Sequence, residues 1–144
     1  MDIPTEADWR SEVWCLDCES AYKRFAGKTR DEAMAMFADN ALLYQEAVMF
    51  MPNRCFGFYA VAYADYLTSD LSLFEDAGAS CFVGIVEIRH AHIRQESPEV
   101  REAIIRTLRA IETNPAWYVD KLAQEYYADL ADRARAALVL IGTS

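Results

Sequence analysis

Thiol chemistry is the first possibility that the sequence raises, because two of its four cysteines are closely spaced. Cys15 and Cys18 form a CxxC motif, and such a motif is redox-active where it opens a helix beside a strand. Here the motif lies inside a helix-like stretch, with no second CxxC and no histidine nearby in sequence. We therefore expect Cys15, Cys18, Cys55 and Cys81 to be reduced, and the CxxC pair to be buried and structural.

A metal centre is the second possibility, because Glu87 and His90 form an ExxH motif. A di-iron site needs two such motifs and two further carboxylates, whereas this chain holds only two histidines, His90 and His92. On a strand these two side chains would share a face and could chelate a metal, but on a helix they point about 200° apart. Since we favour a helix here, we expect no metal, no cofactor, and histidines that are exposed or half-buried.

Covalent catalysis finds little support in the sequence. The motifs GxSxG, GxxxxGK and GxGxxG do not occur, and five glycines are too few for a phosphate cradle. A pair between Cys81 and His90 or His92 stays open, since these residues could lie on neighbouring turns. General acid–base catalysis by Asp65 and Asp70 also stays open, although acidic side chains in a loop are usually solvated. We lean away from an enzyme and assign no catalytic residue.

An aromatic-rich segment leaves two alternatives open. Seven aromatic residues lie between Tyr44 and Tyr66. Core packing accounts for most of them, but a buried tyrosine needs a partner for its hydroxyl, so several are expected at the edge of the core. There they could line a ligand pocket or anchor an interface. A small enzyme or ligand-binding domain is therefore the alternative function, and a homodimer is possible.

The negative charge of the chain is concentrated in two segments. The net charge is −9, of which residues 1–20 carry −5 and residues 61–80 carry −4. Nucleic acids and anionic membranes bind through Lys and Arg, so neither is an expected partner. A basic protein would be attracted, and a concentrated patch speeds its association. The simpler alternative is that the acids only solvate exposed faces.

The candidate contact residues for a basic protein partner form two groups. They are Asp8, Glu12 and Glu19 in the first segment, and Asp70, Glu75 and Asp76 in the second. The sequence does not say whether the two groups meet in space. If they meet, they form one site, and if they do not, solvation becomes the simpler account.

The start of the chain and its apolar runs bear on the compartment. Met1 to Glu6 lack the basic and apolar regions of a signal peptide. The longest uncharged apolar run near the middle, Cys55 to Ala64, is far short of the ~20 residues that a membrane span needs. We expect a cytoplasmic protein.

Helix signals predict one compact all-α domain, residues 1–144, of five or six helices. The first helix is expected from Thr5 to Ala26, with Thr5 as its cap and Gly27 as its stop. It is apolar on two faces, one of them carrying Trp9, Val13 and Leu16, so only its acidic stripe should be exposed.

The middle of the chain predicts two further helices. A capping box of Thr29 and Glu32 opens one, which ends near Asn40 or continues beyond it. Pro52 breaks the pattern, and the aromatic segment that follows it is the best candidate for the central helix. Gly57, in the first turns of that helix, predicts a close helix crossing. Residues 68–79 are expected to form an acidic loop.

The last third of the chain predicts the remaining helices. Residues 80–95 fit a strand by composition and a helix by spacing, and we favour the helix. The pairs Ser97-Pro98 and Asn114-Pro115 each predict a helix start. The last helix is expected to be long, with Val119, Leu122, Tyr126 and Leu130 among its buried residues. Two i,i+4 ion pairs are expected on its exposed side, Lys121 with Glu125 and Asp129 with Arg133.

The middle of the chain also resembles small helical bacterial proteins of uncharacterised activity. The likeness lies in Leu42 to Tyr59, LLYQEAVMFMPNRCFGFY, and continues into Tyr63 and Tyr66-Leu67. Those proteins share a proline followed by an aromatic-rich helix, and some proteins of this size and acidity resemble immunity proteins that neutralise bacterial toxins. The resemblance implies a protein-binding module, most concretely an acidic immunity protein that inhibits a toxin by direct binding. It brings no catalytic residues with it.

Overall fold

The computed structural model describes residues 1–142, and within that range the chain contains helices and turns but no strand. The helices are α1 (Glu6–Trp9), α2 (Leu16–Phe25), α3 (Arg30–Met49), α4 (Asn53–Leu67), η1 (Asp70–Ser72), α5 (Asp76–Ile93), α6 (Pro98–Thr113), α7 (Pro115–Tyr118), η2 (Lys121–Ala123) and α8 (Leu130–Leu140). The all-α expectation is confirmed. The expected five or six helices were too few, because the described chain has eight α-helices, of which α1 and α7 are single turns.

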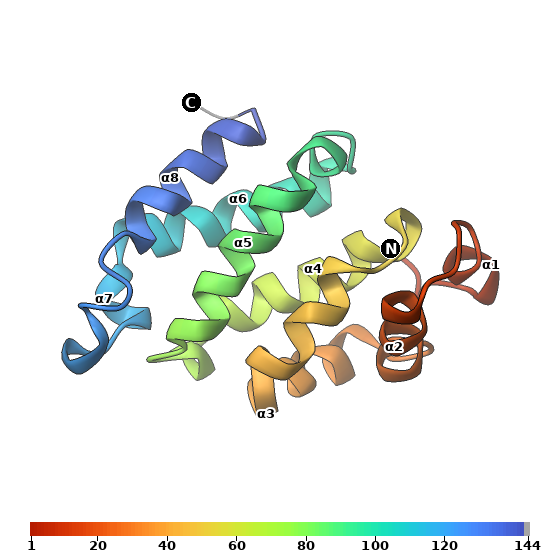
Figure 1. Cartoon of the computed structure of the whole chain (residues 1–144), viewed down its shortest axis with the longest axis horizontal. Helices are drawn as coiled ribbons and strands as arrows, with labels where there is room; N and C mark the ends of the chain where they lie inside the picture. The colour runs from red at the N-terminus through yellow and green to blue at the C-terminus, as the bar shows by residue number, and fades with distance from the viewer. Residues whose placement is uncertain (143–144) are drawn as a thin grey trace.

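Helix α4 is the central helix, as expected. It packs against α3, α5 and α6, and in Figure 1 it crosses behind α3. Every residue from Cys55 to Ala64 is buried, and so are Tyr66 and Leu67. A helix that is apolar on all sides has no face to turn to water, so neighbouring helices must enclose it.

The aromatic side chains of the core pack mainly on one another. The Phe37 and Tyr63 rings stack with their centroids 4.5 Å apart, and Phe82 meets the edge of Tyr63 at 5.1 Å. The buried hydroxyls donate to backbone carbonyls, Tyr59 to Phe25 and Tyr63 to Gly78. These rings therefore form the core, as expected for most of the aromatic residues, whereas Phe50 and Phe58 line surface hollows.

The local start and stop signals in the sequence are confirmed. Thr29 and Glu32 form the capping box of α3, and Thr5 forms a second one with Asp8 at α1. Helix α3 ends at Met49, just before Pro52, although Asn40 interrupts it with a kink rather than ending it. Residues 80–95 are helical over most of their length, as we favoured.

The expected helix from Thr5 to Ala26 is wrong, because the chain turns between α1 and α2. Ser11 Oγ donates to the carbonyl of Asp8, and Cys15 Sγ accepts from the backbone N–H of Cys18 and caps α2. These local side-chain bonds compete with a continuous helix. Val13 is consequently 92% exposed and not buried as expected.

The expected long last helix is also wrong. Val119 is extended after α7, and Asp120 caps the short η2 by accepting from Leu122 N–H. Leu122 and Tyr126 are exposed rather than buried. Among the residues described, neither of the two ion pairs expected here forms, and Arg133 instead contacts Glu87 of α5 at 2.7 Å. Residues 68–79 also differ from a plain loop, because they hold η1 and the start of α5.

Gly57 allows the close helix crossing that its position predicts. A Cβ atom built at Gly57 would lie 2.5 Å from Glu96 Oε2 and 2.9 Å from Val100 Cγ2. Both distances are shorter than a normal contact, so α4 can approach the α5–α6 connection only with glycine at this position.

We expect Gly57→Ala to lower the free energy of unfolding by about 1–3 kcal/mol, because Val100 and Glu96 must move to admit the methyl group. Gly84→Ala is the matched control in α5, where the nearest atom to a new Cβ is 3.8 Å away. That change should raise stability by about 0.5–1 kcal/mol, since glycine weakens a helix interior. Urea unfolding measures the change in the free energy of unfolding for each variant. Equal changes in the two variants would contradict a close helix crossing at Gly57.

Candidate protein-binding surface

The two acidic groups lie at opposite ends of α4 and do not meet. Near the start of α4, the Glu12 carboxylate accepts from the backbone N–H of Asn53. At its other end, Ser72 Oγ, beside Asp70, donates to the carbonyl of Leu67 at 2.8 Å. Fifteen helical residues at about 1.5 Å each separate the groups by roughly 20 Å. The two groups therefore form separate surfaces.

The acids of the N-terminal group all have partners within the chain. The Asp8 carboxylate accepts from Thr5 N–H at 2.9 Å in the capping box, and Glu12 accepts from Asn53. Glu19 accepts from Trp14 Nε1 at 2.5 Å. Asp8, Glu12 and Glu19 thus each accept a hydrogen bond inside the fold, and their role as contact residues stays a prediction.

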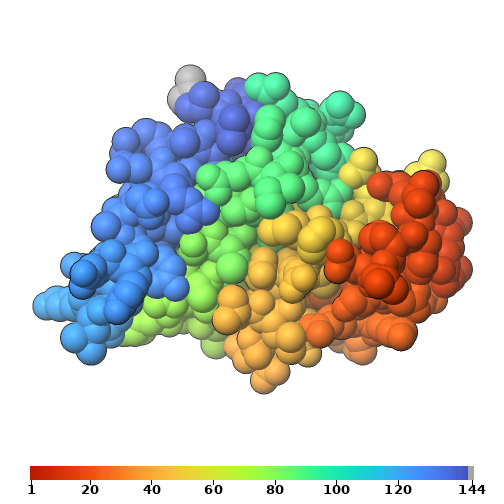
Figure 2. Space-filling view, viewed as in Figure 1, coloured from red at the N-terminus to blue at the C-terminus, as the bar shows by residue number. Residues whose placement is uncertain are grey.

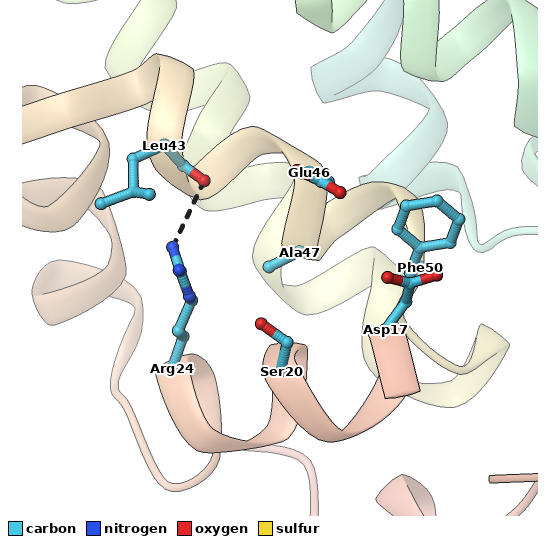
Figure 3. A pocket seen from close by; sticks show the side chains of 7 residues that line it. All are labelled: Asp17, Ser20, Arg24, Leu43, Glu46, Ala47 and Phe50. Atoms are coloured by element: carbon cyan, nitrogen blue, oxygen red, sulfur yellow. Dashed lines mark hydrogen bonds between the residues drawn. The ribbon is translucent and has the colours of Figure 1, made fainter. Parts of the chain in front are cut away.

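A small hollow between α2 and α3 adjoins this end of the molecule. Figure 3 shows its lining residues, Asp17, Ser20, Arg24, Leu43, Glu46, Ala47 and Phe50. Arg24 reaches across it and donates to the carbonyl of Leu43 at 3.4 Å. Its volume of about 90 Å³ is well below the roughly 300–1,000 Å³ of typical ligand pockets.

The acids of the second group flank the 3-10 helix η1. Asp70 is exposed and begins η1, while Asp76 begins α5, where a carboxylate favours the positive end of the helix dipole. Glu75 accepts from the Tyr66 hydroxyl at 2.7 Å, and burial, together with this hydrogen bond, raises the pKa of Tyr66. Asp70 is therefore available to a partner, whereas Asp76 is half-buried and accepts from the backbone N–H of Ala77 at 2.6 Å, and Glu75 is held by the core.

Large apolar side chains project into water between these acids. Leu71 is 67% exposed, Leu73 is 50% exposed and Phe74 is 49% exposed. Sequence reasoning missed them, because it treated the segment as an acidic loop. The signal was present in the run Asp70-Leu71-Ser72-Leu73-Phe74-Glu75-Asp76, where three large apolar residues lie between acids. We call the exposed side chains of Asp70, Leu71, Leu73 and Phe74, together with the half-buried Asp76, the η1 surface.

Phe74 adopts a backbone conformation that bulky residues rarely occupy. Its φ is +61°, in the left-handed region, which costs an L-residue with a side chain roughly 1–2 kcal/mol. Hydrogen bonds on both sides impose it. Phe74 N–H donates to the carbonyl of Trp117 at 2.8 Å, and Glu75 N–H donates to that of Ser72 at 3.0 Å. Strain that the surroundings impose is typical of functional surfaces.

Buried hydrogen bonds hold the η1 surface rigidly against α4 and α7. Ser72 is fully buried, and its hydroxyl accepts from Trp117 Nε1 at 3.0 Å while donating to Leu67. Tyr118 also donates to the Leu67 carbonyl, at 2.7 Å. The exposed apolar side chains thus extend from a rigid backbone, which reduces the conformational entropy lost on binding.

The segment after α7 lies beside the η1 surface. Figure 2 shows residues near 70–80 and 115–125 side by side at one end of the molecule, with the N-terminal residues at the other end. A hollow of about 290 Å³ opens in this segment, lined by Pro115, Ala116, Val119, Gln124, Tyr127 and Ala128. Leu122 and Tyr126 are largely exposed nearby in sequence. This end of the molecule therefore combines exposed apolar side chains, a hollow and the carboxylates of Asp70 and Asp76.

The histidines lie elsewhere and are half-buried, as expected. His92 Nε2 is 2.6 Å from a carboxylate oxygen of Glu96, at the edge of an open groove beside Asp8 and Arg54. In residues 1–142 no group of three or more His, Cys, Asp or Glu side chains is placed to hold a metal ion.

The two catalytic pairings that stayed open in the sequence do not form. Cys81 lies nine residues before His90 and eleven before His92 on the same helix, about 14 Å and about 17 Å along its axis. Burial also raises the pKa of the Cys81 thiol, which makes it a poor nucleophile. Asp65 is 3.4 Å from Arg106 and is not paired with Asp70.

The expectation of four reduced, buried cysteines is only partly correct. Cys55 is a buried thiol, and burial raises its pKa to about 12. Cys15 and Cys18 instead form a disulfide, with Cys15 exposed and Cys18 half-buried. The error follows from the wrong first helix, because the motif opens α2 rather than lying inside a longer helix.

Comparisons with protein-family models, curated proteins and solved structures found no match for this chain. Across residues 1–142, every helix is too short or too polar to cross a membrane. The function must therefore be argued from the surfaces described above.

Proposed function

We propose that this chain is a protein-binding module and that the η1 surface contacts its partner. The single observation that carries the proposal is Phe74, an aromatic residue with a left-handed backbone and a side chain that is 49% exposed, close in sequence to the carboxylates of Asp70 and Asp76. An exposed aromatic side chain on a rigid base, with a polar rim, has the form of a binding hot spot.

The partner that suits this surface is a basic protein with an apolar recess. Residues 61–80 contain four acids and no Lys or Arg, so a basic surface is attracted over a distance of several ångströms. Phe74 and Leu71 would enter the recess, and Asp70 and Asp76 would face the basic rim. The most concrete form of the proposal is an inhibitor that neutralises a basic toxin, as an immunity protein does.

The test uses immobilised full-length chain as bait, with wild type, Phe74→Gly and Ile88→Ser compared in parallel. Glycine accepts the left-handed backbone and removes only the side chain, so the fold is kept. Ile88 is an exposed apolar residue of α5, outside the η1 surface, and serves as the control. A supporting result is a protein that wild type and Ile88→Ser both retain and that Phe74→Gly does not.

Binding measurements on the purified chain and its captured partner then give the size of the effect. We expect Phe74→Gly to weaken the dissociation constant about 30-fold or more, which is about 2 kcal/mol. Replacing Asp70 and Asp76 with Asn should slow association and reduce its dependence on salt. If the partner is a toxin, wild-type chain restores growth of cells that express it and Phe74→Gly does not. Equal binding by wild type and Phe74→Gly would contradict the proposal.

A further inference from the structure

The disulfide between Cys15 and Cys18 opens helix α2 at the edge of the molecule. Their Cα atoms are 5.0 Å apart, and Cys15 is the N-cap residue of α2. In Figure 1 this end of α2 lies beside α1, opposite the end that carries α7. The disulfide is therefore remote from the η1 surface.

A purely structural role explains little about this disulfide. It closes a ring with only two intervening residues, and the stabilisation that a disulfide gives by restricting the unfolded chain is smallest for short rings. The turn before α2 is also held without it, because Arg10 lies 4.0 Å over the Trp14 ring and Trp14 donates to Glu19.

Access distinguishes this pair from the other two cysteines. Cys15 is exposed, and its neighbours Val13 and Leu16 are 92% and 90% exposed, so an incoming thiol meets no covering element. Cys55 is fully buried and Cys81 is half-buried, and burial raises the pKa of both thiols. Thiols in solution therefore reach the pair of Cys15 and Cys18 more readily than Cys55 or Cys81.

The start of α2 also favours the reduced form of Cys15. Its sulfur accepts from the backbone N–H of Cys18 at 3.2 Å, and a thiolate at this position would keep that bond and gain from the helix dipole. Cys18 lies in the first turn of α2, close enough to attack a mixed disulfide on Cys15. Cys15 is thus the exposed sulfur that exchanges with a small thiol, and Cys18 is the resolving sulfur that attacks the mixed disulfide.

We propose that Cys15 and Cys18 form a reversible two-electron redox pair that exchanges with small-molecule thiols. A thiolate of the small molecule attacks Cys15 Sγ, the bond between the two cysteines breaks, and Cys18 leaves as a thiolate that takes a proton from water. A second small-molecule thiolate attacks the small-molecule sulfur of the mixed disulfide. Cys15 then leaves as a thiolate, which also takes a proton from water. The small molecule is oxidised to its disulfide, and the protein gains two electrons and two protons.

The test equilibrates the folded full-length chain in glutathione buffers of graded reduced-to-oxidised ratio. Acid quenching, alkylation and mass spectrometry then count the thiols at each cysteine. We expect Cys15 and Cys18 to convert together with the slope of a two-electron step, while Cys55 and Cys81 stay as thiols. After full reduction, iodoacetamide should modify Cys15 about a thousandfold faster than Cys55, because the Cys55 pKa of about 12 suppresses its thiolate.

Variants separate the roles of the two sulfurs. Cys18→Ser should trap one glutathione on Cys15, Cys15→Ser should trap at least tenfold less on Cys18, and Cys81→Ser should titrate as wild type does. Two results would overturn the proposal. One is a pair that stays oxidised in every buffer until the chain unfolds, and the other is a pair that stays reduced in every buffer. Titration of the wild-type chain alone shows whether either result occurs, so the test does not depend on the folding of a variant. Neither result bears on the η1 surface.

Discussion

We expect Arg89→Met to lower the free energy of unfolding by about 1–3 kcal/mol, the cost of leaving partly buried backbone carbonyls without their charged donor. The Arg89 guanidinium donates to the backbone carbonyl of Met51 at 2.7 Å and to Asn53 Oδ1 at 2.6 Å. It also donates to the carbonyls of Val48 and Met49, both at 3.3 Å. These carbonyls end α3, where a helix leaves its last acceptors without partners.

Methionine is the informative replacement because it keeps most of the side chain's length while removing every donor. Arg89 also lies 4.2 Å over the Phe56 ring, so part of the loss is a cation–π contact. The matched control is Arg94→Met, at an exposed position just beyond α5, where the change should stay within about 0.5 kcal/mol. Chemical denaturation measures both. A loss below 1 kcal/mol at Arg89 would mean that water replaces the guanidinium at the end of α3.

The second large effect is a loss of stability in alkali. Burial raises the pKa of Tyr118 and of Cys55 to about 12, and it raises the pKa of Tyr59, Tyr63 and Tyr66 as well. For an acid whose folded pKa is raised, the stabilisation is complete below the unfolded pKa and is lost as pH rises toward the folded value. The window therefore opens near pH 9–10, where unfolded Cys and Tyr ionise, and extends to about pH 12.

Each such group removes up to about 1.4 kcal/mol per pH unit within that window. Several groups acting together should exhaust a typical stability of about 5–15 kcal/mol before pH 12. We therefore expect the free energy of unfolding to change little between pH 7 and 9 and to fall steeply above pH 10. Circular dichroism of urea unfolding at each pH measures this.

Tyr118→Phe tests the cause of this loss. At pH 8 the variant should be less stable than wild type by about 1 kcal/mol, because it loses the hydrogen bond to the Leu67 carbonyl. Near pH 11 the difference should vanish or reverse, since phenylalanine cannot ionise in the unfolded chain. A difference that is constant across this range would show that Tyr118 does not contribute to alkaline unfolding.

The sequence predicted those parts of the fold that local chemistry decides. The capping box of Thr29, the breaks at Pro52 and Pro98, and the uninterrupted apolar character of α4 each act within a few residues. The crossing at Gly57 is a tertiary contact, but the glycine itself marked it, because a missing side chain allows another element to approach closely.

The errors arose where polar side chains interrupt an otherwise regular apolar pattern. Ser11, Cys15 and Asp120 each form local hydrogen bonds with the backbone, and these divide the two long helices that the pattern favoured. The disulfide between Cys15 and Cys18 was not predicted, because the motif was placed inside the first of these helices.

The candidate surface could be located only in part from the sequence. Asp70 and Asp76 were identified by charge, and both lie on the η1 surface. The contribution of Phe74 depends on a hydrogen bond to Trp117, 43 residues later in the chain, which imposes its left-handed backbone. Tertiary contacts of this kind have no local sequence signal.

Hydrogen–deuterium exchange of the chain with and without its captured partner tests the central claim most directly. We expect protection on binding at residues 69–76 and 115–128, where the η1 surface and the neighbouring hollow lie. Residues 5–20, which hold the N-terminal acids and the disulfide, should exchange at the same rate in both samples. Protection at residues 5–20 with none at residues 69–76 would contradict the assignment of the η1 surface as the binding site.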